Sequence, residues 1–309
     1  MTGRGVVRVP GDKSISHRAL ILAALATGES QIAGILDSAD VNSTASALRG
    51  LGATIPDLSP TFRVSGLGLH GLKRPTADLD AGNSGTTVRL MAGVVAASPF
   101  ASRFTGDSSL SSRPMKRIAD PLRAMGARFE FENEDGLPMT VHGGGLSGII
   151  WNTRAASGQT KSAILLAGLV AGVQVTVIES KKSRDHTERM LKSLGVSITS
   201  DALTASLVPV EALSPLELVV PGDPSSAAYM VALGLLQSEG EVRIPDVCMN
   251  ATRTGFFDAV VRMGGNVEVV DRKAVAGDDV GTLVVRPSTL RDIKVSGGEI
   301  PSMIDELPL

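Results

Sequence analysis

The sequence predicts an α/β (α+β) protein built from a repeated helix–strand–helix–strand unit, and two observations support this prediction. Four segments contain a helix-like apolar run that is closed by Gly and followed by a strand-like stretch: ALRGLGATI, PLRAMGARF, MLKSLGVSI and AVVRMGGNV. Each segment is preceded by a second helix-like stretch that is rich in small residues. A whole supersecondary unit that recurs about every seventy residues indicates a repeat fold.

The elements of each unit follow from local rules. Gly just past an apolar periodic run is typical of a helix C-cap, because Gly adopts the left-handed conformation without steric cost. These closing glycines are Gly52, Gly126, Gly195 and Gly264. The small-residue helices are expected at 16–26, 86–97, 159–171 and 225–236, and short strands at 173–178, 241–244, 136–141 and 205–210.

Two similar stretches indicate where the chain crosses between domains: VPGDKS at 9–14 and VPGDPS at 220–225. Pro and Gly make rigid, sharp connections, which suit crossovers between two bodies. We therefore expect one complete domain of three repeats at 12–222, and a second domain formed by 1–11 and 223–309. A further repeat is expected to open as a helix at 300–309, so we expect the second domain to be incomplete.

The bulk composition excludes several classes of protein. A formal net charge of -2 over 309 residues gives no electrostatic reason to expect nucleic acid or a membrane as partner. The single cysteine, Cys248, excludes an internal disulfide and suits a reducing compartment. The longest apolar stretch, 163–178, is shorter than the roughly 20 residues of a membrane span. We expect a soluble, cytoplasmic protein with no metal and no organic cofactor.

The openings of the first helices suggest where an anion would bind. A helix N-terminus offers free N–H groups and the positive end of the dipole. Each opening alone is weak evidence, because a Ser there usually only caps the helix. Basic residues stand beside three helix or turn starts, and this combination favours a small, doubly anionic substrate. The openings are KS at 13–14, NSGT at 83–86, SGQTK at 157–161 and SS at 225–226, and the basic residues include Arg18, Arg113 and Arg184.

Seven blocks of the sequence together resemble a known family, the 5-enolpyruvylshikimate-3-phosphate synthases, in the order that the family has them. The resemblance implies a two-domain enolpyruvyl transferase fold with three βαβαββ units in each domain. On that count about two units of the second domain are missing, and a complementary C-terminal fragment becomes a candidate partner. The blocks are PGDKSISHRALILAALA, AGNSGTTVRLMAG, GDSSLSSRPMKRI, ASGQTKSAILLAGL, SRDHTERML, PGDPSSAAY and IPSMIDELP.

The resemblance also implies a reaction, the transfer of the enolpyruvyl group of phosphoenolpyruvate to the 5-hydroxyl of shikimate 3-phosphate. Phosphate is released, and the family is the target of glyphosate. The implied catalytic residues are Lys13 and Asp305, of which Asp305 assists proton transfer from the attacking hydroxyl. The implied ligands of shikimate 3-phosphate are Lys13, Ser14, Arg18, Ser157, Gln159, Arg184 and Asp305, and those of phosphoenolpyruvate are Lys13, Gly85, Arg113 and Gln159.

Two alternatives stay open at this point. The UDP-N-acetylglucosamine enolpyruvyl transferases share the repeat fold but place a reactive cysteine before their Arg-Pro block, where this chain has GDSSLSS at 106–112. A non-catalytic shikimate-phosphate-binding fragment is the other alternative. Family members carry a catalytic glutamate and further cations in a later segment that has no counterpart here, so we expect this chain alone to be inactive. Departures from the family pattern are His17, Leu90 and Gly158, where many members have Asn, Pro, and Ser or Ala.

Overall fold

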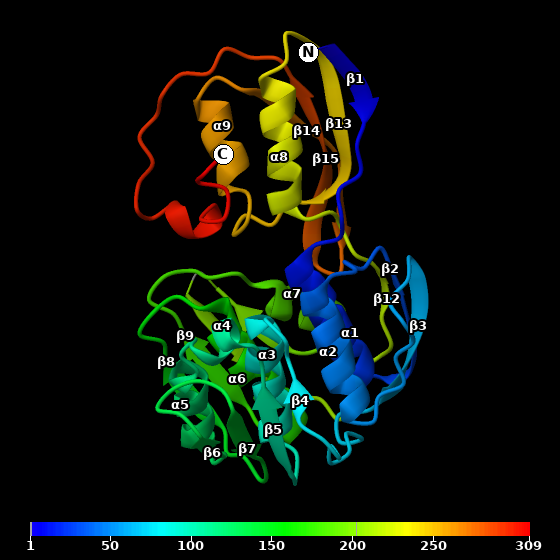
Figure 1. The fold of residues 1–309 in the computed structure, drawn as a ribbon, viewed down its shortest axis with the longest axis vertical. Helices are drawn as coiled ribbons and strands as arrows, with labels where there is room; N and C mark the ends of the chain where they lie inside the picture. Colours follow the sequence, from blue (N-terminus) through cyan, green and yellow to red (C-terminus); the bar gives the residue numbers. More distant parts are fainter. Residues whose placement is uncertain (1, 202) are drawn as a thin grey trace. The chain divides into compact units, whose positions relative to one another are not determined.

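The computed structural model describes residues 2–201 and 203–309, which divide into two compact units (Figure 1). Unit 1 contains the described residues up to Lys13, together with Gly34–Leu36 and Val219–Leu309. Unit 2 contains Ser14–Ala33 and Asp37–Leu218. Within the described chain, no helix is both long and apolar enough to cross a membrane.

The predicted order of helix, strand, helix and strand recurs in the structure. A repeat opens with a first helix and continues after one strand with a second helix. The first helices are α1 (Lys13–Leu25), α3 (Gly85–Ala96), α6 (Gly158–Ala171) and α8 (Pro224–Leu235). The second helices are α2 (Ala39–Gly50), α5 (Lys116–Met125), α7 (His186–Ser193) and α9 (Gly255–Arg262), and a short helix α4 (Ser108–Ser111) precedes α5.

The described strands form four sheets, three of which have the same topology. In each of these three, the first two strands are parallel, and the remaining strands run antiparallel to their neighbours. This is the strand pattern of a βαβαββ unit. Their orders are β4 (Leu79–Asp80), β5 (Ala101–Thr105), β7 (Met139–His142), β6 (Arg128–Phe131); β8 (Ile149–Asn152), β9 (Val175–Ile178), β11 (Thr204–Leu207), β10 (Ile198–Ser200); and β1 (Thr2–Val6), β13 (Glu239–Cys248), β15 (Asp278–Arg286), β14 (Asn266–Val275).

The fourth sheet contains three strands in the order β12 (Glu217–Val219), β2 (Thr27–Ala33) and β3 (Thr61–Leu67). Strands β2 and β3 are antiparallel, with Thr27 opposite Leu67. Strand β12 lies far along the chain from its neighbour β2. The chain therefore returns to the first repeat of unit 2 before it continues into α8.

The four closing glycines confirm the prediction of helix C-caps. Gly52, Gly126, Gly195 and Gly264 have φ angles of 95°, 122°, 82° and 95°. A residue with a β-carbon would be strained at each of these angles. The predicted helix at 300–309 was wrong. A 3-10 turn, η1 (Ile300–Ser302), is followed by further turns, and the buried side chain of Met303 ties this segment to the core of unit 1.

The core of unit 2 is formed largely by its first helices. Every residue of 15–25 in α1, 87–96 in α3 and 160–170 in α6 is buried. Because these helices are buried on all sides, they have no solvent-facing polar stripe, which explains why they lack an amphipathic pattern. Helices α3 and α6 approach closely at Gly93, where a β-carbon would lie 2.3 Å from the carbonyl oxygen of Ala163.

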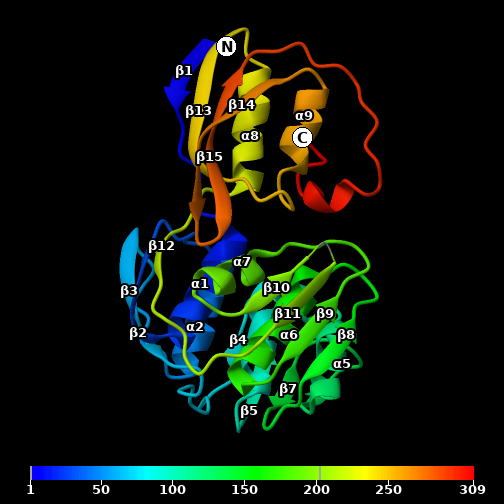
Figure 2. The ribbon, with the colours of Figure 1, turned by 180° about the vertical axis from the view of Figure 1, so that it is seen from behind.

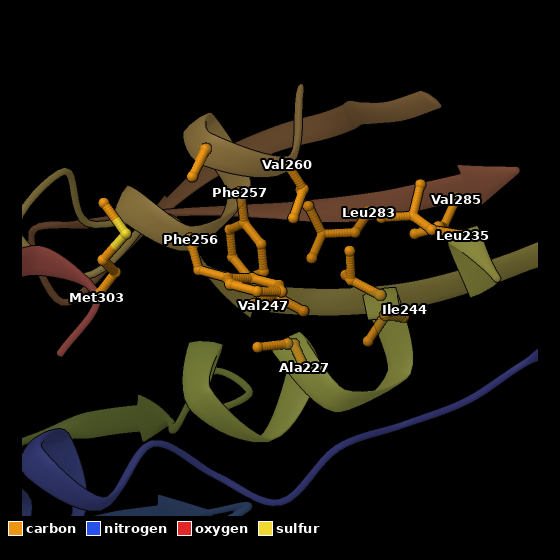
Figure 3. Packing of buried hydrophobic residues seen from close by; sticks show 13 residues of the cluster. Ala227, Leu235, Ile244, Val247, Phe256, Phe257, Val260, Leu283, Val285 and Met303 are labelled. Carbon is orange, nitrogen blue, oxygen red and sulfur yellow. The ribbon is translucent and has the colours of Figure 1, made fainter. Parts of the chain in front are cut away.

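The core of unit 1 lies between its sheet and the helices α8 and α9, which cover one face of the sheet (Figures 1 and 2). Figure 3 shows Phe256 and Phe257 of α9 packed toward Val247 of β13 and Leu283 of β15. Unlike the first helices of unit 2, α8 has exposed apolar residues, Tyr229 and Leu233, and the exposed Leu236 caps its C-terminus.

The two VPGD stretches lie side by side within unit 1. The amide of Asp12 donates to the carbonyl of Pro221 at 2.7 Å, and the amide of Asp223 donates to that of Pro10 at 2.8 Å. The guanidinium of Arg253 joins the two aspartates, with Nη1 3.2 Å from Asp12 Oδ2 and Nη2 2.9 Å from Asp223 Oδ1. All three charged groups lie in a largely buried cluster.

Candidate functional site

Arg18, one of the predicted site residues in unit 2, is held by several hydrogen bonds. Its guanidinium is buried and donates to the hydroxyls of Ser162 and Thr187, both at 2.7 Å, and to the carbonyl of Ser14 at 2.9 Å. Arg18 therefore links the start of α1 to α6 and α7. Sequence reasoning missed Ser162 and Thr187, whose role depends on how these helices pack.

Ser157 caps the N-terminus of α6, and the backbone of Arg184 lies against the first residue of the same helix. Ser157 is the N-cap, and its hydroxyl oxygen accepts a hydrogen bond from the amide of Thr160 at 3.3 Å. The next residue, Gly158, lies against the loop that precedes α7, since a β-carbon there would be 2.9 Å from the carbonyl oxygen of Arg184. The positive end of a helix favours an anion, and a residue that carries a cationic side chain lies next to this one.

Gln159 connects three elements of unit 2. Its Oε1 accepts hydrogen bonds from Arg89 Nη1 at 3.0 Å and from Arg117 Nη2 at 3.3 Å. Its Nε2 donates to the hydroxyl of Thr86 at 3.1 Å. The amide thus joins the first turn of α6 to α3 and α5, and it places two arginines beside one another.

Gly85 lies against two arginines. A β-carbon at Gly85 would be 2.8 Å from Arg89 Nη1 and 3.5 Å from Arg113 Nη1. Arg113 also donates to Asn83 Oδ1 at 2.7 Å, which fixes it on the loop before α3. Arg89 follows Gly85 by one helical turn, so the i, i+4 spacing was a usable signal that sequence reasoning missed.

Arg89, Arg113 and Arg117 form a cluster of positive charge, called here the arginine cluster. In the part of the chain that the structure describes, none of the three forms an ion pair with a carboxylate, and Arg89 Nε is buried without a hydrogen-bond partner. Burial, followed by the charges of Arg117 and Arg113, lowers the pKa of Arg89 to about 10. An anion bound here would relieve this repulsion and satisfy the open donors.

A cavity of about 300 Å³ lies beside the arginine cluster, at the start of α6. Its walls contain two residues of the site, Arg117 and Ser157. The remaining lining residues are Asp120, Trp151, Thr153, Arg154, Ala155, Ala156 and Thr160.

Two predicted residues, Lys13 and Asp305, belong to unit 1. Lys13 is the first residue of α1, and Asp305 has an exposed side chain in the turns after η1. The structure thus collects Ser14, Gly85, Arg18, Arg113, Ser157, Gln159 and Arg184 within unit 2, and it assigns Lys13 and Asp305 to the other unit.

Cys248 has none of the features of a reactive thiol. It is fully buried in β13 of unit 1, and burial, together with the charge of Asp12, raises the pKa of its thiol well above the usual range. A reactive cysteine needs an accessible thiolate. In the loop at 106–112, Asp107 caps α4 by accepting from the amide of Leu110 at 2.7 Å.

The family model for EPSP synthase (3-phosphoshikimate 1-carboxyvinyltransferase) matches residues 2–309. The chain belongs to the EPSP synthase family. It is similar to the 3-phosphoshikimate 1-carboxyvinyltransferases of Brevibacillus brevis, at 44% identity over 308 residues, and of Novosphingobium aromaticivorans, at 45% over 313 residues. These alignments cover 99% of this chain and 72% and 71% of the relatives. A solved EPSP synthase from Acinetobacter baumannii matches with a TM-score of 0.92 and 38% identity, over 100% of this chain and 71% of that chain.

Membership in the EPSP synthase family confirms the predicted fold and class of reaction. The chain has the enolpyruvyl transferase fold, and it is a transferase of the shikimate pathway whose family acts on shikimate 3-phosphate and phosphoenolpyruvate. The matches favour this reading over the UDP-N-acetylglucosamine enolpyruvyl transferases. They give no support to a complementary fragment as partner, and they do not establish that the second domain is incomplete.

Proposed function

We propose that the residues of unit 2 bind shikimate 3-phosphate between the starts of α1 and α6. Arg18 and Arg184 supply the charge for its phosphate, and Ser14, Ser157 and Gln159 supply hydrogen bonds. The support is geometric, because Arg18 is bonded to α6 and α7 and Arg184 packs against Gly158 at the start of α6. Charge-assisted hydrogen bonds from arginine are well suited to phosphate.

The phosphoenolpyruvate side of the proposal rests on the arginine cluster. Arg89 and Arg113 lie against Gly85, and Arg89 and Arg117 donate to Gln159. In the described chain these three guanidinium groups lack a carboxylate partner. Phosphoenolpyruvate carries a phosphate and a carboxylate, so it offers the charge that this cluster needs. The absence of a side chain at Gly85 leaves room for the ligand next to Arg113.

The catalytic roles are proposed from the resemblance, and they suit the chemistry of the transfer. The 5-hydroxyl of shikimate 3-phosphate adds to C2 of phosphoenolpyruvate while C3 gains a proton. Phosphate then leaves as the same methyl group loses a proton. We assign Asp305 as the group that accepts the proton of the hydroxyl, and Lys13 as the cation that contacts both substrates. The support for these two roles is the resemblance at IPSMIDELP and PGDKS.

Binding of the two substrates tests the proposal directly. Calorimetric titration of the 309-residue chain with shikimate 3-phosphate, followed by phosphoenolpyruvate, is expected to show one site for each. Arg113→Met is expected to weaken phosphoenolpyruvate binding by about tenfold. Arg103→Met is the matched control, since Arg103 lies on β5 of the same unit and is paired with Glu132. A chain that binds neither substrate contradicts the proposal.

Two further expectations belong to the same proposal. The domain on the shikimate 3-phosphate side comprises 12–222, and the second domain comprises 1–11 and 223–309. The protein acts in the cytoplasm, a location supported by its single, unpaired cysteine, Cys248.

A further inference from the structure

Lys161 is a buried cation that the proposed reaction does not use. Its side chain is 3% exposed, and its Nζ lies 2.6 Å from Glu179 Oε2 and 2.8 Å from Glu188 Oε1. The two glutamates are 4% and 3% exposed. Lys161 lies in α6, Glu179 follows β9, and Glu188 lies in α7, so this buried triad joins three elements of unit 2.

The triad is connected to the loop that carries Arg184. The second oxygen of Glu179, Oε1, accepts a hydrogen bond from the hydroxyl of Ser183, and Oε2 accepts from the amide of Ser183 at 3.5 Å. Ser183 immediately precedes Arg184 in the chain. The backbone of Glu179 is itself fixed, because its amide donates to the carbonyl of Leu203 at 2.7 Å.

The same loop is confined on its other side by the start of α6. The backbone of Arg184 packs directly against Gly158. A β-carbon at position 158 would lie only 2.9 Å from the carbonyl oxygen of Arg184, so a larger residue would push the loop away. Helix α6 thus contacts the loop directly through Gly158 at its first turn, and it is linked to the loop indirectly through the ion pair of Lys161 with Glu179 about one turn later.

We propose that Lys161 is a positioning residue that holds the loop at 180–185 through Glu179, and thereby places Arg184 for the phosphate of shikimate 3-phosphate. The role in ligand binding rests on the proposed function, whereas the anchoring of the loop does not. No direct contact between Lys161 and the ligand is part of the proposal.

The electrostatics explain why one lysine has this effect. Removing it leaves two carboxylates close together in a buried environment, which is strongly unfavourable. Among the described residues Glu188 Oε2 has no hydrogen-bond partner that could compensate, and burial already raises the pKa of Glu188. Glu179 must then move or become protonated, and either change disturbs the hydrogen bonds to Ser183.

A double-mutant cycle tests the proposal, with calorimetric affinity for shikimate 3-phosphate as the readout. Lys161→Met is expected to weaken binding by about tenfold. In the Arg184→Ala background the same substitution is expected to have little further effect, because Lys161 acts through Arg184. Lys192→Met, at an exposed position of α7, is the matched control and is expected to bind like the wild-type chain. Lys161→Arg, which keeps the charge, is expected to restore part of the affinity.

Hydrogen exchange of the ligand-free chain separates this inference from the proposed function. Amides 182–185 are expected to exchange faster in Lys161→Met than in Lys192→Met. Where Lys161→Met does not fold, Glu179→Gln, which removes one charge at constant size, replaces it and is expected to act in the same direction. If the wild-type chain binds no shikimate 3-phosphate, the proposed function is wrong. The hydrogen-exchange rates of amides 182–185 then still test whether Lys161 anchors the loop. Unchanged exchange, or additive losses of affinity with Arg184→Ala, overturn the inference.

Discussion

Gly85 and Arg89 lie one helical turn apart on α3, so close that a β-carbon at position 85 would be 2.8 Å from Arg89 Nη1. That guanidinium is only partly free to move, because Arg89 is 7% exposed and donates to Gln159 at 3.0 Å. A methyl group at position 85 would therefore displace Arg89 and lengthen its bond to Gln159. Glycine is therefore favoured at position 85 both by the arginine beside it and by the turn before α3.

Gly85→Ala is accordingly predicted to weaken glyphosate, which is slightly longer than phosphoenolpyruvate, by about tenfold in the presence of shikimate 3-phosphate. Calorimetric titration with glyphosate measures the effect. Gly144→Ala serves as the control, because a β-carbon at Gly144 would meet nothing within 4 Å. Equal glyphosate affinity in Gly85→Ala and Gly144→Ala would show that Gly85 does not line the site.

Arg18→Ala and Arg184→Ala are each predicted to weaken shikimate 3-phosphate binding by roughly 1.5–3 kcal/mol, the value of a charge-assisted contact. Their stabilities are predicted to differ. Arg18 is buried and bonded to Ser162 and Thr187, so its loss also loosens α1 from α6 and α7 and lowers Tm. Arg184 is only partly buried, and its loss is expected to change Tm little.

Calorimetry and thermal unfolding on both variants check this pair of expectations. Thr187→Val is a useful companion, because it removes a partner of Arg18 while it keeps the charge. It is expected to lower Tm with a smaller loss of affinity than Arg18→Ala. Unchanged affinity in both arginine variants would remove Arg18 and Arg184 from the phosphate site.

The sequence predicted those features that depend on local rules. The helix ends at Gly52, Gly126, Gly195 and Gly264 could be located because a C-cap requires a left-handed residue within a few positions of an apolar run. The repeat made the order of elements predictable as well. Local signals failed at 300–309, where the expected helix is a 3-10 turn held by Met303 in the core.

The residues that support the site could not be found in this way. Arg253 and Asp12 are 241 residues apart, and nothing near either residue indicates the other. Lys161 lies within the opening SGQTK at 157–161, yet its pairing with Glu179 and Glu188 depends on how α6 packs against α7. Buried charges find their partners through tertiary structure, so their roles emerge only from the fold.

Phosphoenolpyruvate affinity is predicted to fall as the pH rises through about 10, the lowered pKa of Arg89. Below that pH the guanidinium carries its proton and attracts the anion, and above it the charge is lost. Titrations between pH 8 and 11 measure the fall. Arg89→Met is the control. It is expected to bind phosphoenolpyruvate weakly over the whole pH range, without the fall in affinity near pH 10 that Arg89 causes. The same pH dependence in both chains would assign it to another group.

Arg253→Met is predicted to destabilise unit 1 by about 3–5 kcal/mol, because it leaves Asp12 and Asp223 buried together without their cation. Burial, with the charge of Asp12 next, already raises the pKa of Asp223 in the folded chain. A carboxyl whose pKa is higher in the folded state than in the unfolded state binds more protons when folded. Its contribution to stability is therefore greatest at low pH and is lost as the pH rises.

Without Arg253 we expect the pKa of Asp223 to rise further, which makes the stability more dependent on pH. The loss in free energy of unfolding caused by Arg253→Met should therefore be smaller at pH 5 than at pH 8. Urea unfolding at the two pH values, followed through the unit 1 residues by hydrogen exchange, measures it. Arg262→Met is the matched control, since Arg262 forms an exposed ion pair with Glu299 in the same unit and its loss should cost less than about 1 kcal/mol. A deficit that does not change with pH would mean that the two aspartates relax toward water when Arg253 is removed, and that the cluster is held by the backbone pairing of the VPGD stretches alone.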